Sequence, residues 1–248
     1  DWCQAIAAAF ERETGIRVAM ARKSSGEILA QLRAEAQNPR TDIWFGGSSE
    51  THMTAAEANL LQVYNSPNMA NLHDWARRVY EMSRGYCVGV SSGAIGFIHN
   101  REVFARRNLP VPRRWEDLLR PEYRGEIQLP NPNSSGTAYT IIAGLVQLWD
   151  EDRAFSFLRR LNANVNAYTR SGAAPVQAVA RGETGLSVSF DMEAQTLAQQ
   201  GFPIVIGYPE DGTSYEVACM SIMRGARNIQ QARRFYDWYL TPAAMDIG

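Results

Sequence analysis

Hydrophobic and polar positions alternate along this chain in two recurring patterns, one typical of helices and one typical of strands. Near the start, Ala5, Ile6, Ala9 and Phe10 recur at helical spacing up to Gly15, a residue that favours helix termination. A short β-rich run at 16–20 follows. The same alternation continues to the end of the chain. It predicts helices at 5–14, 24–37, 101–108, 115–119, 137–148, 153–161, 173–181, 193–200 and 229–240, and a further helix after Gly46-Gly47-Ser48-Ser49. It predicts strands at 16–20, 41–45, 86–99, 126–129, 164–169, 186–190, 204–206 and 214–223.

Several element boundaries have a local chemical cause. Ser24 and Glu27 have the spacing of a capping box that opens a helix, and Asn38-Pro39 stops that helix. Pro175 lies in the first turn of a predicted helix, where its missing N–H costs nothing. Ser91-Ser92-Gly93 predicts a break in the long strand region 86–99.

Strands and helices alternate nearly throughout, which is typical of α/β architecture with parallel sheets. In such a fold a strand normally comes before the first helix, so we expect one ahead of Asp1. We find no internal repeat and no low-complexity linker. Any domain boundary is therefore expected inside the long strands.

Composition excludes several classes of protein. The chain has 248 residues, 45% of them hydrophobic and 21% charged, with 19 glycines and 11 prolines, which is ordinary for a globular protein. The formal net charge of -1 argues against a general nucleic-acid binder, which usually carries a basic excess. Only Lys23 is a lysine, so lysine chemistry is restricted to that position.

The three cysteines, Cys3, Cys87 and Cys219, are widely spaced and form no Cys-x-x-Cys pair, which argues against a structural zinc site. One disulfide with one remaining thiol, or three thiols, both fit this count. No apolar run approaches the roughly 18 residues of a membrane span.

Five predicted strand-to-helix joints carry small hydroxyl residues, glycine or a carboxylate. They are Ser24-Ser25-Gly26, Gly46-Gly47-Ser48-Ser49, Ser134-Ser135-Gly136-Thr137, Thr169-Arg170-Ser171-Gly172 and Asp191. Ligands of open α/β sheets bind at such joints, and helix N-termini attract anions. Any single joint is also explained as an ordinary N-cap. The joint at 134–137 offers more hydroxyl groups than capping needs, and it predicts an anion cradle. Arg170 is either a bidentate anion contact or a solvated surface residue.

Signatures of catalysis are missing from the sequence. There is no Gly-x-Ser-x-Gly elbow, no nucleotide-binding glycine loop and no short-range metal-ligand pair involving His52, His73 or His99. The sequence therefore favours binding over catalysis, and we expect no catalytic residue, no cofactor and no bound metal.

Several segments resemble a known family. They include 26–30, Asp42-Ile43-Trp44-Phe45-Gly46-Gly47, 93–97, 115–119, 131–139, 164–168 and 212–216. These segments are similar to ABC-importer solute-binding proteins, in the subgroup that binds ferric iron, phosphonates and sugar phosphates. The resemblance covers almost the whole chain.

The resemblance implies a two-lobed, type II periplasmic-binding-protein-like α/β fold. Two strands cross between the lobes, and ligand binds in the interlobe cleft. Lobe one is expected to take residues 1–95 and 212–248, and lobe two residues 96–211. With the joints above, we predict ligand contacts from Ser24, Ser25, Gly47, Ser48, Ser92, Ser134, Ser135, Gly136, Thr137, Arg170, Asp191 and Glu216.

The sequence departs from two branches of that subgroup. The ferric-iron branch carries a Tyr-Tyr pair after the strand at 186–190, and the sugar-phosphate branch carries a His-Asp pair nearby. This chain has Asp191-Met192-Glu193 there. What remains is an anion cradle with two acids, Asp191 and Glu216. This set suits a polar molecule with an anionic head and hydroxyl or amine groups at its other end.

We therefore expect a monomeric periplasmic or surface-anchored carrier, with its signal peptide removed, that delivers a small organic phosphate or phosphonate to the membrane permease of an ABC importer. We expect no nucleic-acid partner. One alternative is ferric iron held by Glu216, Tyr215, Tyr208 and a synergistic anion. The other is an anion-using enzyme on the same fold, with Asp191 or Glu193 as general base.

Overall fold

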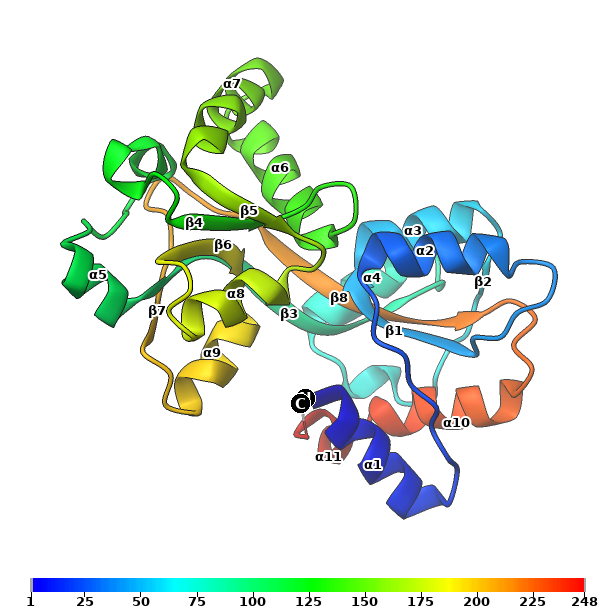
Figure 1. Cartoon of the computed structure of the whole chain (residues 1–248). Helices are drawn as coiled ribbons and strands as arrows, with labels where there is room; N and C mark the ends of the chain where they lie inside the picture. Colours follow the sequence, from blue (N-terminus) through cyan, green and yellow to red (C-terminus); the bar gives the residue numbers. More distant parts are fainter. Residues whose placement is uncertain (1, 248) are drawn as a thin grey trace. The chain divides into compact units, whose positions relative to one another are not determined.

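A computed structural model describes residues 2–247 of the chain, which fold into two compact units (Figure 1). Unit 1 combines residues 1–92 with 217–248, and unit 2 is the continuous segment 93–216. Strands β3 (Val88–Asn100) and β8 (Tyr215–Met223) each contain one of the two boundaries between the units. The expected lobe limits at residues 95 and 212 lie within the first of these strands and just before the second.

Unit 1 packs helices on both faces of a small antiparallel sheet, in which β1 and β2 both pair with β8. Along β1, Ile43 and Phe45 contact the core formed with α1 and α10, whereas Trp44 points to the core formed with α2 and α3. This alternation is the two-residue period of a strand buried on both faces. The elements are α1 (Trp2–Thr14), α2 (Ser25–Ala34), β1 (Ile43–Ser48), α3 (Ser49–Glu57), β2 (Leu61–Gln62), η1 (Met69–Asn71), α4 (Asp74–Met82), α10 (Ile229–Tyr239) and α11 (Pro242–Met245).

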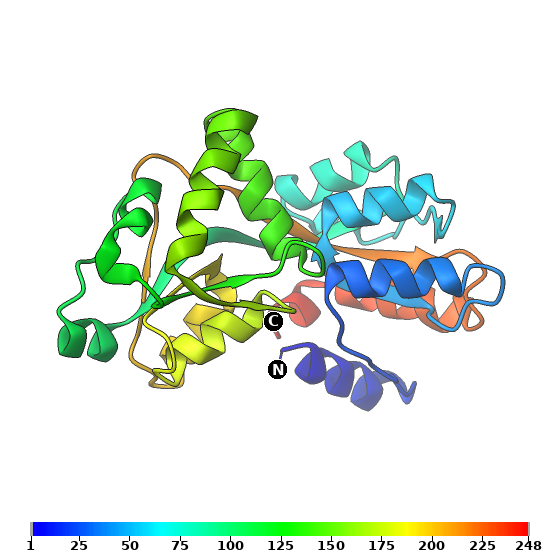
Figure 2. The same cartoon turned by 45° about the horizontal axis from the view of Figure 1, so that its top comes forward.

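Unit 2 is a mixed sheet with helices on both faces (Figures 1 and 2). β4 pairs in parallel with β5 and β6, whereas β3 pairs antiparallel with β6 and β7, so the expectation of parallel sheets is correct only in part. One core contains α6 and α7, and another contains α8 and α9. The elements are α5 (Arg101–Arg107), η2 (Trp115–Leu119), η3 (Pro121–Tyr123), β4 (Ile127–Pro130), α6 (Gly136–Leu148), α7 (Glu151–Leu161), η4 (Asn162–Asn164), β5 (Val165–Thr169), α8 (Ala173–Ala180), β6 (Leu186–Phe190), α9 (Asp191–Gln199) and β7 (Ile204–Gly207).

The predicted strand at 16–20 is wrong, because this segment has no regular secondary structure. A strand needs a neighbouring strand to satisfy its backbone groups. Among the described pairings of unit 1, none involves this segment. A cavity of about 760 Å³ lies beside it, lined by residues 16–23, by β1 residues including Ile43 and Phe45, and by α1 and α10 residues such as Phe10 and Phe235.

The predicted break at 91–93 is also wrong, because β3 runs through it without interruption. A Cβ atom at Gly93 would lie 3.0 Å from an Asp191 carboxylate oxygen, so glycine there lets the strand pass close to that side chain. By contrast, Gly46 and Gly47 lie inside β1, where they have φ angles of +83° and +84° and a register shift interrupts the pairing with β8. These positive angles favour glycine, and the pattern is that of a β-bulge.

Candidate functional site

In unit 2, the predicted anion cradle lies at the N-terminus of α6. Ser135 is the N-cap residue and is buried, yet its hydroxyl makes no capping bond to the helix, and the first turn contains no acidic side chain. The helix start therefore keeps its partial positive charge without an acidic neighbour in its own sequence. Ser134 Oγ donates to the backbone carbonyl of Arg170 at 2.9 Å, which joins the cradle to the loop after β5.

That loop reaches the first turn of α6 because residue 172 is glycine. A Cβ atom at position 172 would collide with the Thr137 side chain. The φ angle of Gly172 is -69°, so the position needs glycine for space and not for backbone conformation. The structure thus brings together two predicted groups, residues 134–137 and the loop that contains Arg170.

Asp191 is the first residue of α9 and is only 8% exposed. Its two carboxylate oxygens accept hydrogen bonds from the Ala94 N–H at 3.2 Å and from the Tyr208 hydroxyl at 2.7 Å. Burial and this bond to Asp191 raise the pKa of Tyr208 to about 12. At neutral pH Tyr208 is therefore a neutral hydrogen-bond donor that helps to hold the Asp191 carboxylate in place.

Glu216, in β8, is tied to α6. Its carboxylate accepts from Thr140 Oγ1 at 2.8 Å, and Thr140 lies one helical turn after Gly136, to whose carbonyl its hydroxyl also lies close, at 3.2 Å. Glu216 thus lies beside the first two turns of the helix that begins at the cradle. Position in the sequence gave no sign of this contact.

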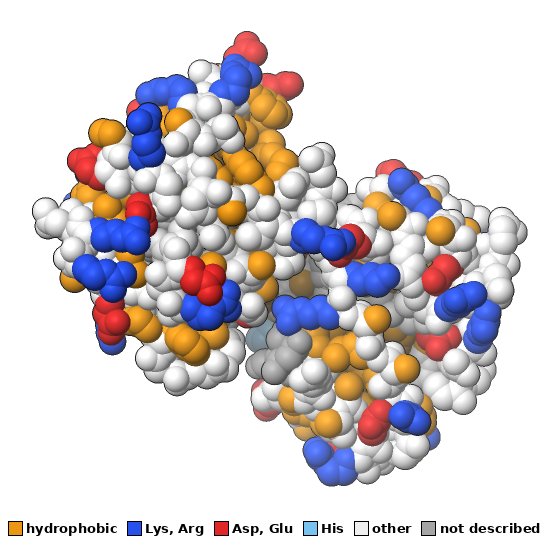
Figure 3. All heavy atoms as spheres, in the orientation of Figure 1, with side chains coloured by type: hydrophobic (Ala, Val, Ile, Leu, Met, Phe, Trp, Pro, Cys, Tyr) orange, Lys and Arg blue, Asp and Glu red, His pale blue; other side chains and the backbone are white. Residues whose placement is uncertain are grey.

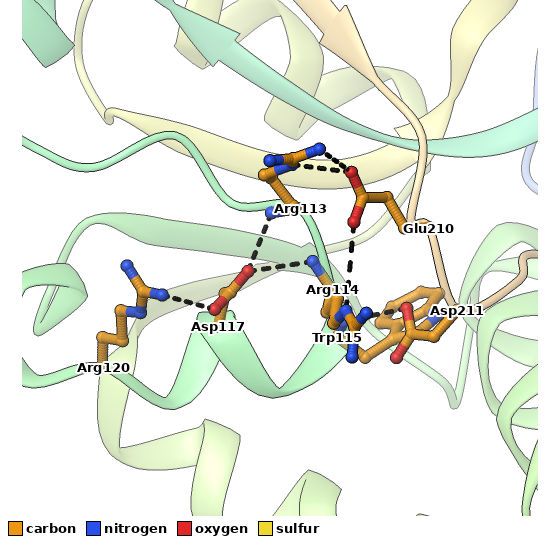
Figure 4. Close-up of polar contacts among 7 residues, drawn as sticks. All are labelled: Arg113, Arg114, Trp115, Asp117, Arg120, Glu210 and Asp211. Carbon is orange, nitrogen blue, oxygen red and sulfur yellow. Dashed lines mark hydrogen bonds and ion pairs between the residues drawn. The ribbon is translucent and has the colours of Figure 1, made fainter.

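The segment between β7 and β8 is bound to residues 113–115 through Glu210 and Asp211 (Figure 4). Glu210 forms an ion pair with Arg113, and its N–H donates to the Arg113 carbonyl at 2.8 Å. The Trp115 indole N–H donates to the Gly212 carbonyl at 2.8 Å. These bonds hold the middle of the segment, between Tyr208 and Glu216, against Arg113 and Trp115.

In unit 1, the predicted residues occupy the starts of α2 and α3. The Glu27 carboxylate accepts from both the N–H and the hydroxyl of Ser24, which confirms the predicted capping box. Ser25 approaches Gly47, where a Cβ atom would lie 3.1 Å from the serine hydroxyl. These contacts bring the first two predicted joints together.

Ser48 caps no helix with its hydroxyl, is fully buried and lies 3.3 Å from the Thr51 hydroxyl. Ser92, in β3, is exposed. The assignment of Ser24, Ser25, Gly47, Ser48 and Ser92 as ligand contacts stays a prediction.

His52, in α3, contacts the glycine bulge of β1. Its Nδ1 lies 2.6 Å from the Ser221 hydroxyl, and its Nε2 lies 2.9 Å from the Gly46 carbonyl. The imidazole stacks on Trp44 with ring centroids 3.9 Å apart. Burial lowers the pKa of His52 to about 4. This histidine is a packed structural residue.

Charges are mixed on the face shown in Figure 3, where basic and acidic side chains are interspersed. Within residues 2–247, no group of three or more His, Cys, Asp or Glu side chains is arranged to hold a metal ion. In the same part of the chain, no helix has the length and apolar character needed to cross a lipid bilayer.

Comparison with known proteins agrees with this architecture. A model of the bacterial extracellular solute-binding protein family matches residues 38–247. The chain belongs to that family. This solute-binding protein is 36% identical to an uncharacterized protein of Haemophilus influenzae over 246 residues, which cover 99% of this chain and 71% of the relative.

Solved structures give the same result. The periplasmic binding protein AfuA from Actinobacillus pleuropneumoniae, solved with exogenous fructose 6-phosphate, is 36% identical and superposes with a TM-score of 0.94, covering 98% of this chain and 77% of AfuA. Iron-bound HitA from Pseudomonas aeruginosa has a TM-score of 0.80 at 19% identity, covering 99% of this chain and 79% of HitA. This solute-binding protein therefore has the type II periplasmic-binding-protein fold, as expected from its sequence.

Proposed function

We propose that this solute-binding protein captures a small organic phosphate or phosphonate and that the anionic head binds at the N-terminus of α6. The observation that carries the proposal is a thirteen-residue helix whose first turn has no acidic side chain and whose N-cap hydroxyl, on Ser135, makes no capping bond. Backbone N–H groups and the hydroxyls of Ser135 and Thr137 then supply donors for phosphate oxygens. AfuA, which binds fructose 6-phosphate, supports this class of cargo.

We propose that the rest of the cargo contacts the carboxylates of Asp191 and Glu216. Asp191 is held by Ala94 and Tyr208, and Glu216 is held by Thr140. A carboxylate with fixed orientation accepts hydrogen bonds from hydroxyl or amine groups with little further loss of side-chain entropy. A sugar phosphate or an aminoalkyl phosphonate presents such groups at the end away from its anionic head.

Ferric iron has less support as the cargo. An iron site at Tyr208 needs a phenolate, yet its hydroxyl donates to Asp191 and its pKa is raised to about 12. The likeness to iron-bound HitA, at 19% identity, shows the fold alone. The enzyme alternative needs Asp191 or Glu193 as a general base. The Asp191 carboxylate already accepts two hydrogen bonds, and the Glu193 carboxylate accepts one from the Gln177 side-chain amide at 3.0 Å.

Members of this family bind the substrates of ABC importers and work with membrane permeases. We extend that role to this chain: it acts outside the cytoplasmic membrane, hands its cargo to a permease without changing it chemically, and needs no cofactor.

Isothermal titration calorimetry tests the proposed cargo class. Fructose 6-phosphate is the probe, and fructose and inorganic phosphate separate the contributions of its two ends. We expect Ser135→Ala and Thr137→Ala each to weaken binding by about 1–3 kcal/mol for each charge-assisted bond lost. Thr196→Ala is the matched control, because Thr196 is exposed on α9 and its hydroxyl donates to a backbone carbonyl of its own helix.

Unchanged affinity in both cradle variants would show that the hydroxyls of residues 135 and 137 do not contact the ligand. If phosphorylated and phosphonate compounds all fail to bind while ferric ion binds, the cargo class is wrong.

A further inference from the structure

Two of the three cysteines lie together in the core of unit 1. Cys87 immediately precedes β3, and Cys219 lies within β8, the strand that neighbours β3 in the sheet. Both side chains are fully buried, and with Val79 and Val217 they form one small cluster. The Cys219 side chain also lowers the pKa of the Cys87 thiol, against the effect of burial, because the two thiols are near each other.

Contacts of the neighbouring residues indicate that Cys87 and Cys219 lie on the same face of β3 and β8 and close to each other. β3 runs from unit 1 into unit 2, and β8 runs from unit 2 into unit 1, so the two neighbours are antiparallel. A Cβ atom on Gly89 would lie 2.8 Å from a Val217 methyl group, so positions 89 and 217 are cross-strand neighbours. In antiparallel strands, the positions two residues before Gly89 and two residues after Val217 are also neighbours, and these positions are Cys87 and Cys219.

The backbone hydrogen bonds of Cys87 indicate whether Cys87 and Cys219 exchange backbone bonds with each other. The Cys87 N–H donates to Ser83 Oγ at 3.1 Å, and its carbonyl accepts from the same hydroxyl at 3.0 Å. These two groups are thus used within the turn before β3 instead of being exchanged with Cys219. Pairs without exchanged backbone bonds are the closer kind, with Cα atoms about 4.5 Å apart. Disulfides span Cα distances of about 4.4–6.8 Å.

We infer that Cys87 and Cys219 form a disulfide when the chain folds under oxidising conditions. The oxidant is an external disulfide. The thiolate of one cysteine attacks it and releases one thiol, and the thiolate of the second cysteine then displaces the other. The chain loses two protons and two electrons, and the oxidant becomes two thiols. Because both side chains are buried in the folded unit, the bond forms before β3 and β8 are enclosed.

The bond joins the chain on either side of unit 2, so the covalent loop it closes contains all of residues 93–216. Cys3, in α1, lies outside this pair and keeps its thiol. The inference is independent of which solute is bound.

Oxidative refolding tests it. The full chain is unfolded in reductant, refolded in a buffer of reduced and oxidised glutathione, denatured, alkylated and digested with trypsin. We expect the peptides 85–101 and 182–224 to be recovered joined, 2 Da lighter than the sum of the two thiol peptides, and the peptide with Cys3 to be alkylated. Adding reductant before alkylation should separate the two peptides. In the intact protein, reduction of the bond should lower the thermal midpoint by several degrees.

Cys3→Ser is the matched control and should leave the joined peptides unchanged, whereas Cys87→Ser and Cys219→Ser should abolish them. Three alkylated cysteines after refolding to a native circular dichroism spectrum would overturn the inference, as would a bond that involves Cys3. Because the decisive measurement uses the natural sequence, poor folding of a serine variant does not affect it.

Discussion

His52 makes the stability of unit 1 sensitive to acid. It is fully buried, and burial lowers its pKa to about 4, whereas an unfolded histidine titrates near 6.5. The folded state therefore favours neutral imidazole, so its contribution to stability is complete above pH 6.5 and is lost as pH falls towards 4. The full difference corresponds to about 3 kcal/mol. Between pH 7.5 and pH 5.0 the loss from this residue is about 2 kcal/mol.

The perturbation is His52→Gln, which keeps a polar side chain near Ser221 and Gly46 but cannot titrate. Urea unfolding at the two pH values gives the free energy of unfolding for each protein. We expect the natural chain to lose about 2 kcal/mol more than the variant over this interval. His73→Gln, at an exposed position, is the control and should behave like the natural chain.

An NMR titration supplies a direct check, since the chain has three histidines and single variants assign their signals. A His52 resonance that titrates near pH 6.5 in the folded protein would refute the reasoning, as would equal acid losses in the natural chain and His52→Gln. Protonation also removes the acceptor that Nδ1 offers to the Ser221 hydroxyl, so the contact between His52 and Ser221 should loosen in the same pH range, whereas the Nε2–H bond to the Gly46 carbonyl is kept.

Two further predictions concern unit 2. Tyr208→Phe removes a hydrogen bond to Asp191 and should lower the free energy of unfolding by about 1 kcal/mol. Because the pKa of Tyr208 is raised, the contribution of this bond is complete below pH 10 and is lost as pH rises towards 12. Thermal midpoints of the two proteins at neutral and alkaline pH measure this loss, and equal midpoints at neutral pH would contradict the prediction. Gly172→Ala forces the Thr137 side chain aside and should weaken phosphate-ester binding roughly 10-fold or more in calorimetry, whereas Gly207→Ala, whose Cβ would meet only a carbonyl oxygen at 3.9 Å, should bind normally.

Local sequence signals predicted much of the fold because their causes are local. The capping box at Ser24 and Glu27 involves neighbouring residues, and the helix with Pro175 in its first turn is observed as α8. The segment 16–20 shows the limit of such signals. Its residues favour a strand, but strand formation depends on a partner that the segment's own sequence does not specify.

The candidate site was predictable only in its separate parts. Joints between strands and helices marked residues 134–137 and Asp191, since small hydroxyl residues and an acid are visible there, whereas Glu216 came from the resemblance of segment 212–216 to the family. The partners that orient the acids come from distant positions: Thr140 and Glu216 are 76 residues apart. Nothing near Tyr208 in the sequence indicates that its hydroxyl reaches Asp191.

The division into units also sets an order for folding during synthesis. Every residue of unit 2 has been made once the chain reaches residue 216, and its cores draw on no later segment. Unit 1 still lacks β8, to which β1 and β2 pair, and the α10 residues Phe235 and Tyr239 of its core. Because domains generally fold as units during synthesis, the middle of this chain should become native first. Until residues 217–248 emerge, the first 92 residues remain exposed to chaperones and proteases.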